Sequence, residues 1–153
     1  MSALDTDILA EKTQAVHRHL KRVADRLPAD VSSFQPLSDA SDAVILHLWQ
    51  ATQIVIDLAL GACVHFNLGT PSGYGDAFRR LETAGLLDSA LSERMVKAAG
   101  FRNTIAHAYE TLDMKRVHVA ATDGPRDLIA FVKTLRDHLG GNLGKSLLER
   151  LRE

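Results

Sequence analysis

The sequence predicts an all-α protein, an antiparallel up-and-down bundle of about five to six helices. Apolar residues recur at steps of three and four over long stretches, which is the spacing of one face of a helix. Short segments rich in glycine and proline separate these stretches. No stretch of the sequence shows the sustained alternation of apolar and polar residues that indicates a strand. Consecutive amphipathic helices joined by short turns bury their apolar faces by packing side by side.

The composition is that of an ordinary globular protein. The chain has 153 residues, of which 46% are hydrophobic and 24% are charged. We expect residues 1–140 to form one helical domain and residues 141–153 to be a C-terminal tail that can also be helical. Eighteen basic and nineteen acidic side chains nearly cancel. Any site for nucleic acid therefore has to be a local patch.

Three features indicate a cytoplasmic protein that does not enter the membrane. The single cysteine, Cys63, has apolar neighbours and is expected to be a core thiol in a reducing compartment. The N-terminal sequence is acidic and lacks the long apolar core of a secretory signal. The most apolar run, residues 54–66, is interrupted by Asp57 and is too short to cross a bilayer.

Two long helices are expected in the first half of the chain. Residues 5–26 carry an apolar face at helical spacing, and residues 27–39 then break the helix with two prolines and several small polar residues. A second helix is expected over residues 41–67. Its inward stripe consists of Ile45, Leu48, Trp49, Thr52, Val55, Ile56, Ala59 and Cys63.

The clearest linker is LGTPSGYGD, residues 68–76, with three glycines and one proline. Its glycines resemble those of a phosphate-binding loop. However, no Gly-Lys-Ser/Thr follows and no strand precedes it, so a turn between helices is favoured.

Shorter helices are expected in the second half. Residues 76–85 form the third helix, which Gly85 ends, and Asp88 or Ser89 can cap a fourth that extends to about residue 109. Residues 112–124 are expected to form another short helix. Residues 125–140 are expected to form the last one, because they begin with proline and end with glycine.

The fourth helix carries an unusual set of polar side chains in AGFRNTIAHAYE, residues 99–110. Arg102 and Tyr109 share one stripe with apolar residues. The apolar members of that stripe are Leu91, Met95, Ala98 and Ile105. A buried arginine has to be paired. Either it meets an acid inside the bundle, for which Asp57 is the candidate, or the stripe opens onto a groove or a partner subunit.

Asn103 and His107 are one turn apart and share another face of this helix. Arg102 and His107 are about 140° apart on an ideal helix, so both reach one site only if the arginine curls round or the groove is wide. Taken singly, each residue is explained by a salt bridge, a cap or a surface position. Their joint pattern is what indicates a function.

The pattern Arg-Asn-x-x-x-His-x-Tyr resembles the signature of the HEPN superfamily and, within it, of the HepT toxins, which is Arg-x-x-x-x-His-x-Tyr. Arg102, His107 and Tyr109 carry that signature here, and Asn103 occupies the polar position after the arginine. The resemblance extends to GYGDAFRRLETAGLLD before the motif helix and to LALGACVHFNLG in the second helix. It therefore covers roughly residues 40–140.

The resemblance implies a helical bundle that forms a homodimer and cuts RNA without a metal ion or cofactor. It implies that Arg102 and His107 are catalytic and that Asn103 supports them. It also implies a partner antitoxin, a nucleotidyltransferase of the MNT type, that neutralises the toxin by adenylylating Tyr109. The chemistry is reasonable, because RNA supplies its own nucleophile and needs only proton transfer and charge stabilisation.

Other basic residues are candidates for contacts with RNA. Those nearest to the motif in the sequence are Arg79, Arg80, Arg94 and Lys97. The basic run over residues 17–22 is better explained as a solvated helix face. Its two histidines, at i and i+2, face apart, and no cysteine or carboxylate cluster completes a metal site. No metal is expected.

Two other functions are compatible with a helical bundle. One is a non-catalytic HEPN module that holds a substrate for a nucleotidyltransferase, and the other is a plain dimerisation protein. A pure scaffold would not need the set of Arg102, His107 and Tyr109, so the sequence favours the nuclease.

Overall fold

The computed structural model describes residues 4–152, with side chains as far as residue 139. It contains helices and no strand within that range, which confirms the predicted all-α class. The α-helices are α1 (Thr6–Arg26), α2 (Asp39–His65), α3 (Tyr74–Thr83), α4 (Ser89–Ala108) and α5 (Met114–Arg152). Two short 3-10 helices, η1 (Val31–Ser33) and η2 (Tyr109–Thr111), lie between them.

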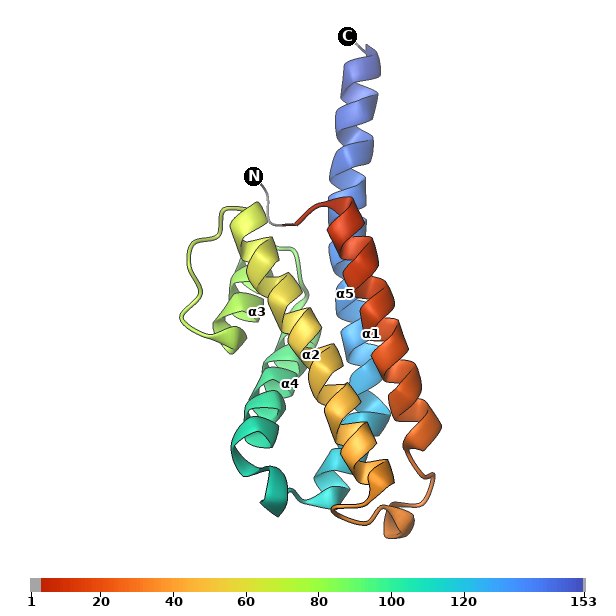
Figure 1. Ribbon diagram of the computed structural model, residues 1–153. Coiled ribbons are helices and arrows are strands. Elements are labelled where there is room, and N and C mark those ends of the chain that lie inside the picture. The colour runs from red at the N-terminus through yellow and green to blue at the C-terminus, as the bar shows by residue number, and fades with distance from the viewer. Residues whose placement is uncertain (1–3, 153) are drawn as a thin grey trace.

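Helix α2 is the centre of the bundle, because each of the other four α-helices packs against it. In Figure 1, α1 and α5 lie side by side along one flank of α2, and α3 and α4 lie along the other. Buried side chains occur on several sides of α2 rather than on one stripe, as expected for a helix enclosed by neighbours.

Taken as a whole, α2 is also long and apolar enough to cross a membrane, with 27 residues and a mean hydropathy of 1.5 over its most apolar window. The apolar run over residues 54–66, from which no span was expected, is only the second half of this helix. Half of that window is buried against the rest of the bundle. A core helix of a helical bundle passes the same test.

The start of α4 follows from a side-chain cap. Asp88 is the N-cap residue, and its Oδ1 accepts a hydrogen bond of 2.7 Å from the backbone N–H of Leu91. This settles the choice that the sequence left between Asp88 and Ser89. Towards the other end of α4, Ile105 is the only buried residue after Ala99, so the last two turns leave most of their side chains accessible.

The structure corrects the prediction of two separate helices over residues 112–124 and 125–140. Helix α5 is continuous and contains Pro125. A proline inside a helix removes one hydrogen bond and crowds the preceding turn, at a cost of about 3 kcal/mol. Burial offsets that cost on both sides. Val117 and Ala121 belong to one core cluster, and Leu128 and Phe131 belong to the other. The same helix continues through the expected tail as far as Arg152.

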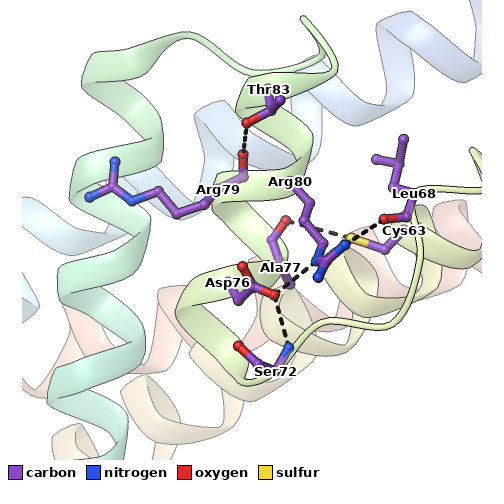
Figure 2. A network of polar contacts seen from close by, with 8 residues as sticks. All are labelled: Cys63, Leu68, Ser72, Asp76, Ala77, Arg79, Arg80 and Thr83. Carbon is purple, nitrogen blue, oxygen red and sulfur yellow. Dashed lines mark hydrogen bonds and ion pairs between the residues drawn. The ribbon is translucent and has the colours of Figure 1, made fainter.

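The linker after α2 is a turn, as predicted, and Arg80 fastens it to α3 (Figure 2). Nη1 of Arg80 donates a hydrogen bond of 2.9 Å to the carbonyl of Leu68, and its Nε donates one of 2.8 Å to the carboxylate of Asp76. Asp76 also accepts from the backbone N–H of Ser72 at 2.8 Å. Gly69 has a φ of +84°, and an added Cβ there would lie 2.9 Å from Arg80 Nη1. The glycine therefore permits both the turn and the approach of the guanidinium.

Cys63 is a free and buried thiol, as the sequence predicts. Its Sγ lies 3.5 Å from the carbonyl of Ala77 on α3 (Figure 2). Burial raises the pKa of this thiol above its usual value. Cys63 is therefore a packing residue between α2 and α3.

We expect Arg80→Met to lower the free energy of unfolding by about 1–3 kcal/mol, because it removes two hydrogen bonds from a charged donor and keeps the aliphatic stem. Urea denaturation measures the change. Arg79→Met is the matched control, because Arg79 is exposed and only pairs with Glu82 three residues later. That control should change the stability by less than about 0.5 kcal/mol. Equal losses in the two variants would contradict the role of Arg80 in fastening the linker.

Candidate active site

The motif lies at the C-terminal end of α4 and in the 3-10 turn that follows. The helix ends because Ala108 has φ −140° and ψ 38°, which is outside the helical region, and the chain then enters η2. Arg102 and His107 therefore lie on regular helix, whereas Tyr109 begins the turn. The predicted helix end, at about residue 109, is correct to within one residue.

Arg102 is half-buried, and α2 supplies most of its contacts. Its Nε donates a hydrogen bond of 2.7 Å to the side-chain oxygen of Gln53. The guanidinium carbon also lies 5.0 Å from the ring centre of Trp49 and 5.5 Å from that of Tyr74 on α3. At such distances the rings attract the cation and restrict its movement. The arginine that the sequence placed on an inward stripe thus lies against two rings and an amide.

The suggested pairing of a buried Asp57 with Arg102 is wrong in this structure. Asp57 is exposed, and its Oδ1 accepts a hydrogen bond of 2.9 Å from Nε2 of Gln53. Gln53 and Asp57 are one turn apart on α2, so the amide of Gln53 stands between the acid and the arginine. The predicted partner lies on the correct helix, α2, but the residue that binds Arg102 directly is the neutral Gln53.

Asn103 and His107 are both exposed on α4. Asn103 Oδ1 accepts a hydrogen bond of 3.1 Å from Nη1 of Arg102. Among the side chains that the structure describes, none is hydrogen-bonded to the imidazole of His107, and no hydrogen bond joins it to Arg102. Both ring nitrogens of His107 are therefore available to a ligand.

Tyr109 is 37% exposed, and its hydroxyl donates a hydrogen bond to the carboxylate of Asp42 in the first turn of α2. Partial burial, the hydrogen bond to Asp42 and the negative charge of Asp42 raise the pKa of the phenol to about 12. The phenol is thus neutral at physiological pH and points its proton at a carboxylate.

The four basic residues that are expected to position RNA have different partners in the structure, and none of these partners belongs to the motif. Arg79 is exposed and lies 3.3 Å from Glu82, whereas Arg80 is engaged in the linker. Arg94 pairs with Asp127 at 2.8 Å, and Lys97 lies 3.7 Å from Glu93. No ion pair or hydrogen bond among the described side chains connects any of the four to the motif.

Arg94 and Lys97 instead line a groove of about 490 Å³ between α2, α4 and α5. Phe101 contributes to its apolar lining, and Lys115 and Arg116 contribute further positive charge from α5. Arg102 and His107 are not among the lining residues. The groove is therefore distinct from the surroundings of the motif.

Sequence reasoning did not find Asp42, Gln53 or Tyr74 as neighbours of the motif. Trp49 was assigned only to the inward stripe of α2, and Asp42 had the appearance of an ordinary first-turn acid. A pairing between helices leaves no periodic signal in one sequence, so nothing in the spacing could have connected these residues to α4.

His19 and His47 form another contact that the sequence did not predict. Their Nδ1 atoms lie 3.0 Å apart between α1 and α2. Desolvation lowers the pKa of both rings, with nearby arginines adding to the effect. Within the described part of the chain, no group of three or more His, Cys, Asp or Glu side chains is placed to hold a metal ion.

The sequence profile of the family described as "Ribonuclease HepT-like" matches residues 16–135, which include the whole of α2, α3 and α4. The chain belongs to the ribonuclease HepT-like family. This confirms the resemblance that Arg102, His107 and Tyr109 indicated.

A curated relative of this HepT-like chain is the mRNA nuclease HepT of Shewanella oneidensis. The two are 28% identical over 130 residues, which cover 85% of this chain and 97% of the relative. A solved structure of the tri-AMPylated Shewanella oneidensis HEPN toxin in complex with MNT antitoxin is 27% identical to this chain, with a TM-score of 0.78. The match covers 86% of this chain and 98% of that toxin.

Another similar structure is a toxin–antitoxin complex with AMP-PNP, also 27% identical with a TM-score of 0.78, over 86% of this chain and 98% of that one. YutE of Bacillus subtilis, a cytosolic protein of unknown function, has the same TM-score at 17% identity. That match covers 94% of this chain and 96% of YutE, and it supports only the fold. The HepT-like fold therefore extends over nearly the full length of these neighbours.

We expect Asp42→Asn to lower the pKa of Tyr109 from about 12, because the variant removes the negative charge beside the phenol. The pKa should stay above the ordinary value, since the burial of the ring remains. Tyrosinate absorbance during a pH titration measures the change. The chain has two tyrosines, so the experiment is made in a Tyr74→Phe background. Asp39→Asn, an exposed acid in the same turn of α2, is the control and should leave the pKa unchanged.

Proposed function

We propose that this protein is a metal-independent endoribonuclease and the toxin of a toxin–antitoxin pair. The observation that carries the proposal is the arrangement of Arg102 and His107 on one helix end. Among the described side chains, Arg102 is held by its neighbours without an ion pair, and the exposed ring of His107 has no hydrogen-bond partner. Cleavage of RNA by its own 2′-hydroxyl requires two groups. One is a cation whose charge is not neutralised by a partner, and the other is an imidazole that is available for proton transfer.

In the proposed reaction, the 2′-oxygen of the RNA attacks the adjacent phosphorus and the bond to the 5′-oxygen breaks. The imidazole of His107 takes the proton of the 2′-hydroxyl, since such a ring can accept or donate a proton near neutral pH. The guanidinium of Arg102 donates hydrogen bonds to the phosphate and stabilises the charge that develops there. The products are a 2′,3′-cyclic phosphate and a free 5′-hydroxyl.

The leaving 5′-oxygen needs a proton, and one histidine per chain is too few to act as base and acid at once. We therefore propose a homodimer that brings two copies of α4 together, so that each supplies one His107. The exposure of the last two turns of α4 is compatible with such an interface.

We also propose that the protein acts in the cytoplasm, where its RNA substrate and its antitoxin meet it.

The proposed partner is a nucleotidyltransferase antitoxin. The similar Shewanella toxin forms a complex with an MNT antitoxin. The acceptor would be Tyr109. Its phenol oxygen attacks the α-phosphorus of ATP, pyrophosphate leaves, and the phenol proton passes to a base. The adenylyl group then places an anionic phosphate two residues from His107, where it competes with the RNA phosphate for Arg102.

We expect the purified protein to cut RNA in the presence of EDTA. Under those conditions, His107→Ala and Arg102→Ala should each lose about 10²-fold or more in rate, because each removes a group that acts on the transition state. Gel analysis of RNA fragments measures the rate, and light scattering should give about twice the chain mass of 16.7 kDa for every variant.

The matched controls are His17→Ala and Arg126→Ala, two exposed residues far from the motif in the sequence, which should keep full activity. Cleavage that disappears with EDTA and returns with magnesium would refute the metal-independent mechanism. RNA binding without cleavage would favour a non-catalytic module.

We expect Tyr109→Phe to remain a folded nuclease that its antitoxin and ATP cannot silence, because the variant keeps the ring and removes the acceptor oxygen. Transfer of label from ATP and residual RNA cleavage are measured together. Tyr74→Phe is the control, since it removes the other phenol and should be labelled like the parent protein. Full labelling and silencing of Tyr109→Phe would exclude Tyr109 as the acceptor.

A further inference from the structure

The amide of Gln53 connects two charged groups and has a defined orientation. Its Nε2 donates a hydrogen bond of 2.9 Å to the carboxylate of Asp57, and its Oε1 accepts one of 2.7 Å from Nε of Arg102. A carboxylate only accepts hydrogen bonds and a guanidinium only donates them. The amide can satisfy both in one orientation only, so Asp57 fixes which end of Gln53 meets Arg102.

The same contacts decide which edge of Arg102 is left for a ligand. The Nε group is occupied by Gln53, and one hydrogen of Nη1 is directed at Asn103 at 3.1 Å. The rings of Trp49 and Tyr74 lie 5.0 and 5.5 Å from the guanidinium carbon. Among the side chains that the structure describes, Nη2 has no hydrogen-bond partner. The edge of the guanidinium formed by Nη1 and Nη2 can therefore donate hydrogen bonds to a phosphate.

A neutral partner suits this task better than an acid does. A glutamate in place of Gln53 would cancel the charge of Arg102 and would be repelled by Asp57. The amide aligns the guanidinium through a short hydrogen bond and leaves its positive charge for the ligand. Gln53 is also only partly buried, so its place on α2 is not explained by core packing.

We infer that Gln53, oriented by Asp57, is a positioning residue for RNA cleavage that acts through Arg102. This inference rests on the proposed nuclease function. It assigns α2 a part in the reaction, although the family signature lies entirely on α4 and η2. Gln53 itself need not touch the RNA, since its effect passes through the direction of the arginine.

The experiment compares Gln53→Leu with Gln50→Leu. Gln50 lies one turn away on α2 and is also partly buried, and among the described side chains it makes no hydrogen bond to Arg102, so it is the matched control. We expect Gln53→Leu to lower the single-turnover rate of RNA cleavage about tenfold or more, which is the usual effect of one hydrogen bond to a charged group. Gln50→Leu should change the rate by less than about twofold.

A binding cycle tests whether the effect passes through Arg102. The affinity for a 2′-O-methyl RNA oligonucleotide, which cannot be cleaved, is measured for the parent, Gln53→Leu, Arg102→Ala and the double variant. Gln53→Leu should weaken binding in the parent and should add less than about twofold in the Arg102→Ala background. An equal loss in both backgrounds would overturn the inference, because Gln53 would then act on the RNA or on the fold directly.

A second variant keeps the test valid if Gln53→Leu does not fold. Asp57→Leu changes an exposed position and frees the amide to rotate, so it should slow cleavage several-fold without changing the thermal midpoint. Full activity of Gln53→Leu, or of Asp57→Leu in its place, beside an inactive Arg102→Ala would overturn the inference and leave the proposed function intact. Full activity of Arg102→Ala would instead refute the proposed function.

Discussion

The enclosure of α2 is the constraint on which the rest of the structure depends. The four other α-helices pack against this one helix, and its buried side chains belong to both core clusters. A helix with apolar residues on several sides has to be surrounded, so α1 and α5 are drawn to one flank and α3 and α4 to the other (Figure 1). Asp42 and Gln53 of α2 remain accessible, and they are the residues that bind Tyr109 and Arg102.

This arrangement makes α2 both the core and one wall of the candidate site. Its first turn provides Asp42 for the hydroxyl of Tyr109, and its middle provides Trp49 and Gln53 for Arg102. Trp49 and Gln53 are partly buried, and Asp42 is exposed. The packing of α2 into the bundle therefore also determines where these three side chains meet the polar groups of α4.

The surroundings of Arg102 show how a partly buried cation can be held without losing its charge. An ion pair would satisfy the guanidinium and would also neutralise it. Two aromatic rings and one amide oxygen restrain it with weaker interactions that leave the charge in place. At Tyr109 the partner is charged instead, and partial burial together with the carboxylate of Asp42 raises the pKa of the phenol. The two ends of the motif therefore have different electrostatic surroundings, neutral at Arg102 and acidic at Tyr109, although they are only seven positions apart.

Sequence patterns predict the helical class, the linker after α2, the cap region of α4 and the motif of Arg102, His107 and Tyr109. These features follow from local spacing and residue type, which one sequence records directly. The continuation of α5 through Pro125 depends on tertiary packing, because burial on both sides of the proline outweighs the local break. The contacts of Arg80 with the linker and of Gln53, rather than Asp57, with Arg102 likewise depend on packing between helices. Contacts between helices depend on how the helices cross, and the spacing along one chain carries no record of that crossing.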